Sequence, residues 1–138
     1  MRILTFQARH FSWEAHSQTL ADAPAPGPAQ TVENPLVVFL HIEEKDSGDE
    51  AFKGVLRKAL KHIKWLANKR ELKNVVLHSF AHLGGSNADP AFALEWMQAL
   101  QQRLENTGYR VSMTPFGHFC EWEISVRGES LAKVWKSI

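Results

Sequence analysis

The sequence predicts a single α/β domain, residues 1 to 138, built on a mixed sheet with two main amphipathic helices. Two apolar segments, residues 35 to 42 and 74 to 80, are typical of buried strands, and a helical pattern follows each before a further strand begins. This alternation requires crossover connections, which place neighbouring strands parallel. Short strand segments near both ends of the chain are expected to add antiparallel edges. A chain of 138 residues can bury one core without a disulfide or a metal ion.

The first third of the chain is predicted to hold a hairpin, a connector and a central strand. "RILTFQA" (residues 2 to 8) and "FSWEA" (residues 11 to 15) are strand candidates joined by a tight turn. The Pro- and Ala-rich residues 21 to 34 show no periodicity and are expected to form an extended surface loop. "PLVVFLHI" (residues 35 to 42) is almost continuously apolar, which indicates a strand covered on both faces. An acidic loop, "EEKDSGDE", follows it.

Two helices are predicted from apolar positions that repeat at helical spacing. The first runs from residue 50 to about 69, with most of its lysines and arginines opposite an inner face made of Phe52, Val55, Leu56, Ala59, Leu60, Ile63, Leu66 and Ala67. The second begins with Asp89 as N-cap and Pro90 as first helical residue, and Gly108 follows its end. Its inner face is marked by Ala93, Leu94, Met97, Leu100 and Leu104.

The last third is predicted to contain two paired strands and a closing helix. "YRVSMTP" (residues 109 to 115) gives one strand and "FCEWEISV" (residues 119 to 126) the next. Gly128 is expected in a turn, and "SLAKVWKSI" (residues 130 to 138) in a short helix.

A turn that carries a histidine leads into the last of these strands. Pro115 and Gly117 interrupt regular pairing, so His118 stands where the backbone bends. The two-residue alternation of the strand puts Cys120 on the same face as Trp122, among the apolar positions. A turn at the start of a strand is a common place for a functional site, because a rigid scaffold holds exposed N–H groups there.

Composition favours a reduced, cytoplasmic protein that does not insert into a membrane. The chain has one cysteine, no apolar signal region at its start and no apolar run near the length of a membrane span. No glycine-rich phosphate loop, GxSxG elbow or CxxC pair is present, which argues against several large enzyme classes. No cofactor is expected.

One segment is strongly basic although the net charge is only +1. Residues 53 to 73 hold eight Lys or Arg and a single acid, Glu71. Such a stripe can attract a phosphate backbone, or it can be the solvated face of a helix. The sequence leaves both interpretations open.

Three histidines and the cysteine stand at strand ends, where chemistry is often placed. His78, His82, His118 and Cys120 could form a tetrahedral zinc site if the strand ends meet, although their spacing matches no recurring zinc pattern. Cys120 could instead act as a nucleophile with His82 or His118 as its base. In the structural alternative, His78 and Cys120 simply belong to the apolar interior.

The loop "SFAHLGGSNADP" (residues 79 to 90) is a third candidate site. Its small residues leave backbone N–H groups free for an anionic or carbonyl oxygen, with His82 in reach. The alternative is an ordinary connection between a strand and a helix.

With these segments identified, the whole chain resembles the N-terminal editing domain of archaeal threonyl-tRNA synthetases, which has the fold of D-aminoacyl-tRNA deacylases. "MRILTFQARHFSWEA" resembles the opening of that domain, "SFAHLGGSNADP" its "FAHL" loop, "TPFGHF" its "PFG" turn and "ISVRGESLA" its closing segment. The order and spacing of these motifs are more specific than any one of them. Since the chain ends at Ile138, it looks like a free-standing version of the domain.

The resemblance implies hydrolysis, in trans, of the ester that joins serine to the 3′ end of threonine tRNA. His82 would then help to read the aminoacyl group, and His118 and Cys120 are further candidate catalytic residues. No metal ligand is assigned. The residues expected to line the substrate pocket are Phe80, Ala81 and His82 on one side and Pro115, Phe116, Gly117, His118 and Phe119 on the other. Deacylase relatives are dimers, so a homodimer is expected.

The chain departs from the family's pattern, with a change of charge at two positions. After "PFG" the family typically shows two tyrosines and a catalytic lysine, where this chain has His118, Phe119 and Cys120. A later family glutamate is Lys133 here. Two alternatives to a deacylase therefore stay open: a catalytically weak module that binds tRNA or a small ligand, and a cysteine- or metal-dependent hydrolase of other small esters. The amino acid removed, the tRNA preferred and any contact between residues 53 to 73 and RNA are not settled by the sequence.

Overall fold

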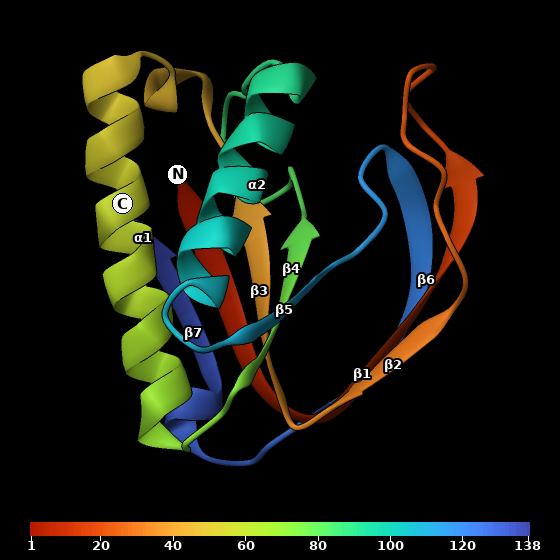
Figure 1. Ribbon diagram of the computed structural model, residues 1–138, viewed down its shortest axis with the longest axis vertical. Helices are drawn as coiled ribbons and strands as arrows, with labels where there is room; N and C mark the ends of the chain where they lie inside the picture. The colour runs from red at the N-terminus through yellow and green to blue at the C-terminus, as the bar shows by residue number, and fades with distance from the viewer.

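The computed structural model describes all residues, 1 to 138, as one seven-stranded sheet with two long helices (Figure 1). The strands are β1 (Arg2–Gln18), β2 (Gln30–Glu33), β3 (Pro35–His41), β4 (Asn74–Ser79), β5 (Arg110–Met113), β6 (His118–Val126) and β7 (Lys133–Ser137). The helices are α1 (Asp49–Lys69) and α2 (Pro90–Glu105), and two short 3-10 turns are η1 (Glu44–Asp46) and η2 (Ser130–Ala132). The predicted fold class, one α/β domain with a mixed sheet and two amphipathic helices, is confirmed.

Strand β1 is the longest element of the sheet and joins its two parts. Its first half pairs antiparallel with β3 and β7, and its second half pairs antiparallel with β2 and β6. The predicted hairpin between residues 2 to 8 and 11 to 15 is therefore wrong. The chain continues through the expected turn because it has partners on both sides, and an irregularity between Ala8 and His10 provides the bend instead. Figure 1 shows β1 curving from the helical layer toward β2 and β6.

The central strands are parallel, as the alternation of elements predicts. β3 pairs with β4 and β4 with β5 in parallel register, and every residue of β3 is buried. Helices α1 and α2 cover one face of this part of the sheet and form the larger apolar core with it (Figure 1). A second, smaller cluster, which includes Phe11 and Phe39, fills the space under the curled part. No helix has the length and apolar character needed to cross a membrane.

Helix α2 begins as the sequence predicts, with Asp89 as N-cap. Its carboxylate accepts hydrogen bonds from the backbone N–H groups of Ala91 at 2.9 Å and Phe92 at 3.4 Å. Pro90 occupies the first helical position, where a missing N–H costs nothing. This cap fixes the end of α2 that lies beside the strand ends.

Three predictions about the chain ends and connectors need correction. Strands β5 and β6 do not pair with each other, since β5 pairs with β4 and β6 pairs with β1. Residues 133 to 137 form β7 rather than a closing helix, because the edge of β1 offers this short segment a full ladder of partners. The connector at residues 21 to 34 contains β2, whose four residues pair with His10 to Trp13.

The apolar face predicted for β6 is correct, but it is only partly covered. Ile124 packs against the smaller core cluster, and the Trp122 ring lies 5.5 Å from the Phe39 ring between centroids. Trp122 nevertheless remains 42% exposed, and Cys120 is half-buried. Cys120 and Trp122 border a cavity.

Candidate functional site

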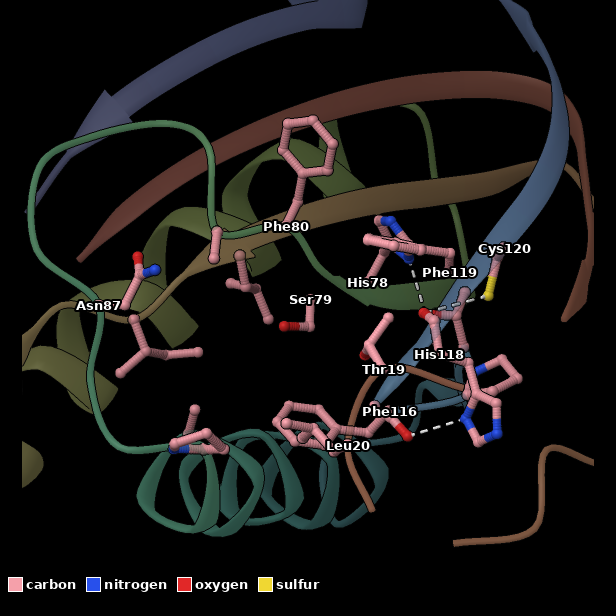
Figure 2. Close-up of a pocket in the computed structure, with 18 of the residues that line it drawn as sticks. Thr19, Leu20, His78, Ser79, Phe80, Asn87, Phe116, His118, Phe119 and Cys120 are labelled. Atoms are coloured by element: carbon pink, nitrogen blue, oxygen red, sulfur yellow. Dashed lines mark hydrogen bonds between the residues drawn. The ribbon is translucent and has the colours of Figure 1, made fainter. Parts of the chain in front are cut away.

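A cavity of about 380 Å³ lies where the ends of β3 and β4 meet α2 and the start of β6 (Figure 2). The structure brings to it every residue that the sequence nominated for a site, namely Phe80, Ala81, His82, Pro115, Phe116, Gly117, His118, Phe119 and Cys120. Figure 2 shows side chains of the loop after β4 facing those of the turn before β6 across this space. The two motifs are 33 residues or more apart in sequence and are joined only by the fold.

The first wall is the loop after β4, and the buried side chain of His41 fixes it. His41 Nδ1 accepts the backbone N–H of Leu83 at 3.2 Å. Its Nε2–H donates to the carbonyl of Ser86 at 3.0 Å and to the side-chain oxygen of Asn87 at 2.7 Å. Since both acceptors are oxygens without hydrogens, His41 is held as the neutral ring protonated on Nε2. This role could not be predicted from the sequence, because the contact joins a strand end to a loop 42 residues away.

A second anchor holds the same loop through the start of the chain. The Arg2 guanidinium lies 3.3 Å from a carboxylate oxygen of Glu43 and donates to the Leu83 carbonyl at 3.2 Å. Glu43 is itself buried and accepts from the Met1 ammonium group at 2.6 Å. A side chain at Gly84 would meet the Arg2 guanidinium, so it would have to displace this anchor.

The second wall is the turn before β6, and its geometry depends on Gly117. This residue has φ +77°, a left-handed conformation that favours glycine, and an added Cβ would lie 2.6 Å from the Ala23 Cβ. Its carbonyl accepts the N–H groups of Thr19 at 2.7 Å and Leu20 at 3.2 Å. These two hydrogen bonds hold the segment after β1 against the turn. Thr19 and Leu20 also line the cavity. Neither residue was predicted to line the site, since nothing in the local sequence marks them.

His78 lines the cavity from the end of β4 and is held by Thr114. Its Nδ1 lies 2.7 Å from the Thr114 hydroxyl, which donates to the Leu77 carbonyl at 3.5 Å. The hydroxyl therefore accepts the Nδ1–H, and Nε2 remains as the hydrogen-bond acceptor of the ring. Burial among Phe39, Phe80 and Thr114 lowers the pKa of His78 to about 4, so the ring is neutral at pH 7.

The three nominated catalytic side chains lie in different surroundings. His82 is exposed and its ring meets the Phe80 ring edge to face, with centroids 5.2 Å apart. His118 donates its Nδ1–H to the Phe116 carbonyl at 3.1 Å, which leaves Nε2 as an acceptor in the neutral ring. Burial raises the pKa of the Cys120 thiol, and its sulfur lies 3.9 Å from the His118 carbonyl. The thiol is thus protonated at neutral pH.

The four hypothetical zinc ligands line the same cavity, but they are not arranged around one point. No group of three or more His, Cys, Asp or Glu side chains is arranged to hold a metal ion. His78 already uses one ring nitrogen for Thr114, and His118 uses one for its own turn.

Both walls offer backbone N–H groups that are free to bind a ligand. The N–H groups of Ala81 and His82 on one wall, and of Phe116 and Gly117 on the other, donate to no acceptor within the protein. All four residues line the cavity. Free N–H groups beside a cavity can hold a carbonyl oxygen or an oxyanion, because they carry fixed partial positive charge.

Comparison with known proteins identifies the family to which this chain belongs. Residues 1–138 match the family described as the archaea-specific editing domain of threonyl-tRNA synthetase. This chain belongs to that family. It is 37% identical to the threonine–tRNA ligase of Staphylothermus marinus over 143 residues, covering 100% of the chain and 22% of that protein. It is 34% identical to the threonine–tRNA ligase of Pyrobaculum calidifontis, covering 99% of the chain and 22% of that protein.

A solved structure shares the fold of the editing domain. The c-Myc DNA unwinding element binding protein superposes with a TM-score of 0.65 at 13% identity, covering 100% of this chain and 99% of its own. At this identity the likeness shows the fold alone. The chain spans about a fifth of the length of the curated relatives that it matches, so the activity of those whole ligases does not transfer with the family.

The two changes of charge that the resemblance implies, at Cys120 and Lys133, occupy different places in the editing domain. Cys120, which stands where the family typically has a lysine, lines the cavity. Lys133, which stands in place of a glutamate, is exposed at the start of β7 and does not line the cavity. Only the first change therefore alters the chemistry of the cavity directly.

Proposed function

We propose that this editing domain, supplied in trans, hydrolyses the ester that joins a wrong amino acid to the 3′ end of a tRNA. The preferred substrate is serine on threonine tRNA. The observation that carries the proposal is the cavity in which the "FAHL" loop and the "PFG" turn of the family face each other. Both walls supply free N–H groups, which suits a reaction in which negative charge develops on a carbonyl oxygen.

The need for such a reaction follows from the difference between serine and threonine. A pocket built for the larger residue gains only about 1–3 kcal/mol from one methyl group, so the synthetic site cannot exclude serine by binding alone. A second site that admits the smaller residue and rejects the larger one supplies the missing discrimination. Phe80 and Phe116 lie on opposite sides of the cavity and are the side chains proposed to limit the size of the amino acid that enters.

In the proposed mechanism, geometry contributes more than a strong protein base. The N–H groups of Phe116 and Gly117 hold the carbonyl oxygen as it becomes an oxyanion, and His82 contacts the aminoacyl group at the mouth. The unprotonated Nε2 of His78 accepts a hydrogen bond from the serine hydroxyl or from the attacking water. The ribose hydroxyl of the tRNA assists the water, and His118 relays its proton from the rim of the cavity. The ester C–O bond breaks, and the products are free serine and the tRNA with its 3′-terminal hydroxyl restored.

Cys120 is assigned to the wall of this site and not to the nucleophile. A thiol attacks as its thiolate, and burial raises the pKa of Cys120. The protein is proposed to act as a homodimer in the cytoplasm, where charged tRNA is used.

A catalytically weak binding module is the second candidate. It is favoured by one observation, the thiol of Cys120 in the wall of the cavity, where the resemblance implies a lysine. This candidate predicts that the cavity binds the aminoacylated 3′ end but releases no amino acid.

Deacylation of seryl and threonyl esters of threonine tRNA tests the proposal. We expect the purified chain to release serine at least tenfold faster than threonine, and His82→Ala to lose most of this rate. His16→Ala is the matched control, since His16 is also exposed but lies outside the cavity. Release from neither ester, with retained binding of the charged 3′ end, would favour the binding module. Loss of release on treatment with a chelator would favour the metal-dependent alternative.

A further inference from the structure

A second cleft, separate from the candidate site, lies between α1 and β7. Its volume is about 680 Å³, and it is lined by Lys58, Lys61, His62, Trp65, Val134, Trp135, Lys136, Ser137 and Ile138. Strand β7 pairs only with β1, so the cleft runs along an edge of the sheet. Figure 1 shows α1 and β7 side by side at this edge, with β6 on the other side of the molecule. None of its lining residues lines the candidate site.

Every charged side chain that lines this cleft belongs to a lysine. Lys58, Lys61 and Lys136 are exposed, and none of them forms an ion pair with a carboxylate. Three unpaired ammonium groups around one concave surface, on a chain with a net charge of only +1, fit an anionic partner.

The cleft also presents aromatic rings and an unpartnered nitrogen. Trp65 is 45% exposed and Trp135 is 53% exposed, although tryptophan usually lies inside. His62 is only 8% exposed, and its Nε2 is buried without any hydrogen-bond partner. Burial and the nearby ammonium group of Lys136 lower the pKa of His62, which agrees with a neutral ring beside that lysine.

From this arrangement we infer that the cleft between α1 and β7 is a docking surface for RNA, which binds the sugar–phosphate backbone and stacks an unpaired base on Trp65. Lysines with exposed aromatic rings are the combination that holds a nucleic acid strand, because the ammonium groups neutralise phosphates while the rings stack on bases. An acidic peptide would pair with the lysines, but its carboxylates would not stack on the exposed rings of Trp65 and Trp135.

The inference assigns a role to Lys58, Lys61 and Trp65, which belong to the basic segment of residues 53 to 73. The inference that the cleft binds RNA depends on the proposed function in one respect, namely that the RNA is a tRNA. The candidate site holds the charged 3′ end, and the cleft holds another part of the same molecule. Its contribution is to affinity, since none of its residues reaches the reacting ester.

Binding of an uncharged threonine tRNA transcript tests this surface. The affinity of the purified chain is measured by fluorescence anisotropy over a range of salt concentrations. We expect the triple variant Lys58→Ala, Lys61→Ala, Lys136→Ala to reduce the slope of log affinity against log salt by about 2 to 3, from three lost phosphate contacts. Trp65→Ala alone is expected to weaken binding about tenfold. Circular dichroism verifies that each variant is folded.

The matched control removes the same charge from outside the cleft. Lys53→Ala, Arg103→Ala, Lys133→Ala also takes away three exposed positive charges, none of which lines the cleft. Equal losses in both triple variants would overturn the inference, because binding would then follow net charge. No loss in the cleft variant would overturn it as well. So would binding of vesicles of phosphatidylserine and phosphatidylcholine in the absence of RNA binding.

Deacylation separates this inference from the proposed function. If both hold, the cleft variant raises KM for seryl-tRNA and leaves kcat unchanged. If the chain releases no serine but binds tRNA through the cleft, the proposed function fails and the inference stands. If serine is released with the same KM by the cleft variant, the inference fails and the proposed function stands.

Discussion

His78 and Thr114 are joined by a 2.7 Å hydrogen bond that ties the end of β4 to the residue after β5. The bond orients a buried, neutral imidazole at the wall of the cavity. It also leaves only one ring nitrogen, Nε2, for a substrate or a water. A buried histidine with such a partner contributes to both stability and chemistry, and the two contributions can be measured separately.

The first prediction concerns the pH dependence of stability. Burial lowers the pKa of His78 from 6.5 to about 4, so below pH 6.5 the unfolded chain binds a proton that the folded chain does not. Stability should therefore fall from pH 6.5 to about 4, by roughly 3 kcal/mol from this residue, and His62 adds to the fall in the same direction. His78→Gln should flatten the curve of unfolding free energy against pH in this window.

Chemical denaturation at several pH values measures this slope. His16→Gln makes the same chemical change at an exposed histidine and should keep the slope of the original protein. A His78→Gln variant that is less stable by the same amount at every pH would contradict the assigned protonation and leave His78 as a packing residue only.

The second prediction concerns the turn at Gly117. Alanine there must adopt φ +77° and its Cβ would lie 2.6 Å from the Ala23 Cβ, so we expect Gly117→Ala to destabilise the protein by about 2 to 4 kcal/mol. Serine release should fall by about 100-fold, because the free N–H groups of the turn move. Gly128→Ala is the control, since nothing lies within 4 Å of an added Cβ there. Thermal unfolding and single-turnover deacylation report both effects, and equal behaviour of the two variants would refute the role of the turn.

The third prediction concerns Cys120. Because burial raises the pKa of this thiol, it should react slowly with thiol reagents at pH 7 and faster as the pH rises. Cys120→Ala should keep serine release within about threefold, since the proposed chemistry uses no thiolate. Loss of release in both Cys120→Ala and Cys120→Ser would instead establish the cysteine-dependent hydrolase.

The fourth prediction concerns the buried carboxylates that hold the loop anchor. Although burial alone would raise the pKa of Glu43, the Met1 ammonium group and Lys45 hold it below the ordinary value of 4.5. The stability that this carboxylate contributes is therefore present above pH 4.5 and is lost as the pH falls through its lowered pKa. Glu43→Gln should cost about 3 kcal/mol at pH 7, because it removes one partner from a buried charge pair.

The control for this change is its exposed neighbour. Glu44→Gln removes the same charge from a surface position and should change the unfolding free energy by less than about 0.5 kcal/mol. Amide hydrogen exchange of residues 81 to 87 should also rise in Glu43→Gln, since Arg2 would lose its carboxylate partner and hold the Leu83 carbonyl less firmly. Unchanged exchange would show that His41 alone anchors the loop.

Local patterns were sufficient to predict the central elements. The helical spacing of α1, the cap of α2 at Asp89 and the apolar runs of β3 and β4 are properties of short segments, and each segment adopts the structure that buries its own apolar face. The same patterns failed at the chain ends. Residues 2 to 8 and 11 to 15, which were expected as two strands of a hairpin, lie in the single strand β1, and residues 133 to 137 form a strand instead of a helix. These outcomes depend on the pairing of β1 with β7, and a pairing partner is not visible in either segment alone.

The site divides in the same way. The sequence by itself determined the motifs that face the cavity, the loop with His82 and the turn with Gly117, together with the family to which they belong. Only the tertiary structure decided that Thr19 sits on that turn, that His41 clamps that loop and that Thr114 sets the free nitrogen of His78. The physical reason is that a buried polar group must find a hydrogen-bond partner wherever the fold supplies one, and these partners lie 36 to 98 residues away along the chain.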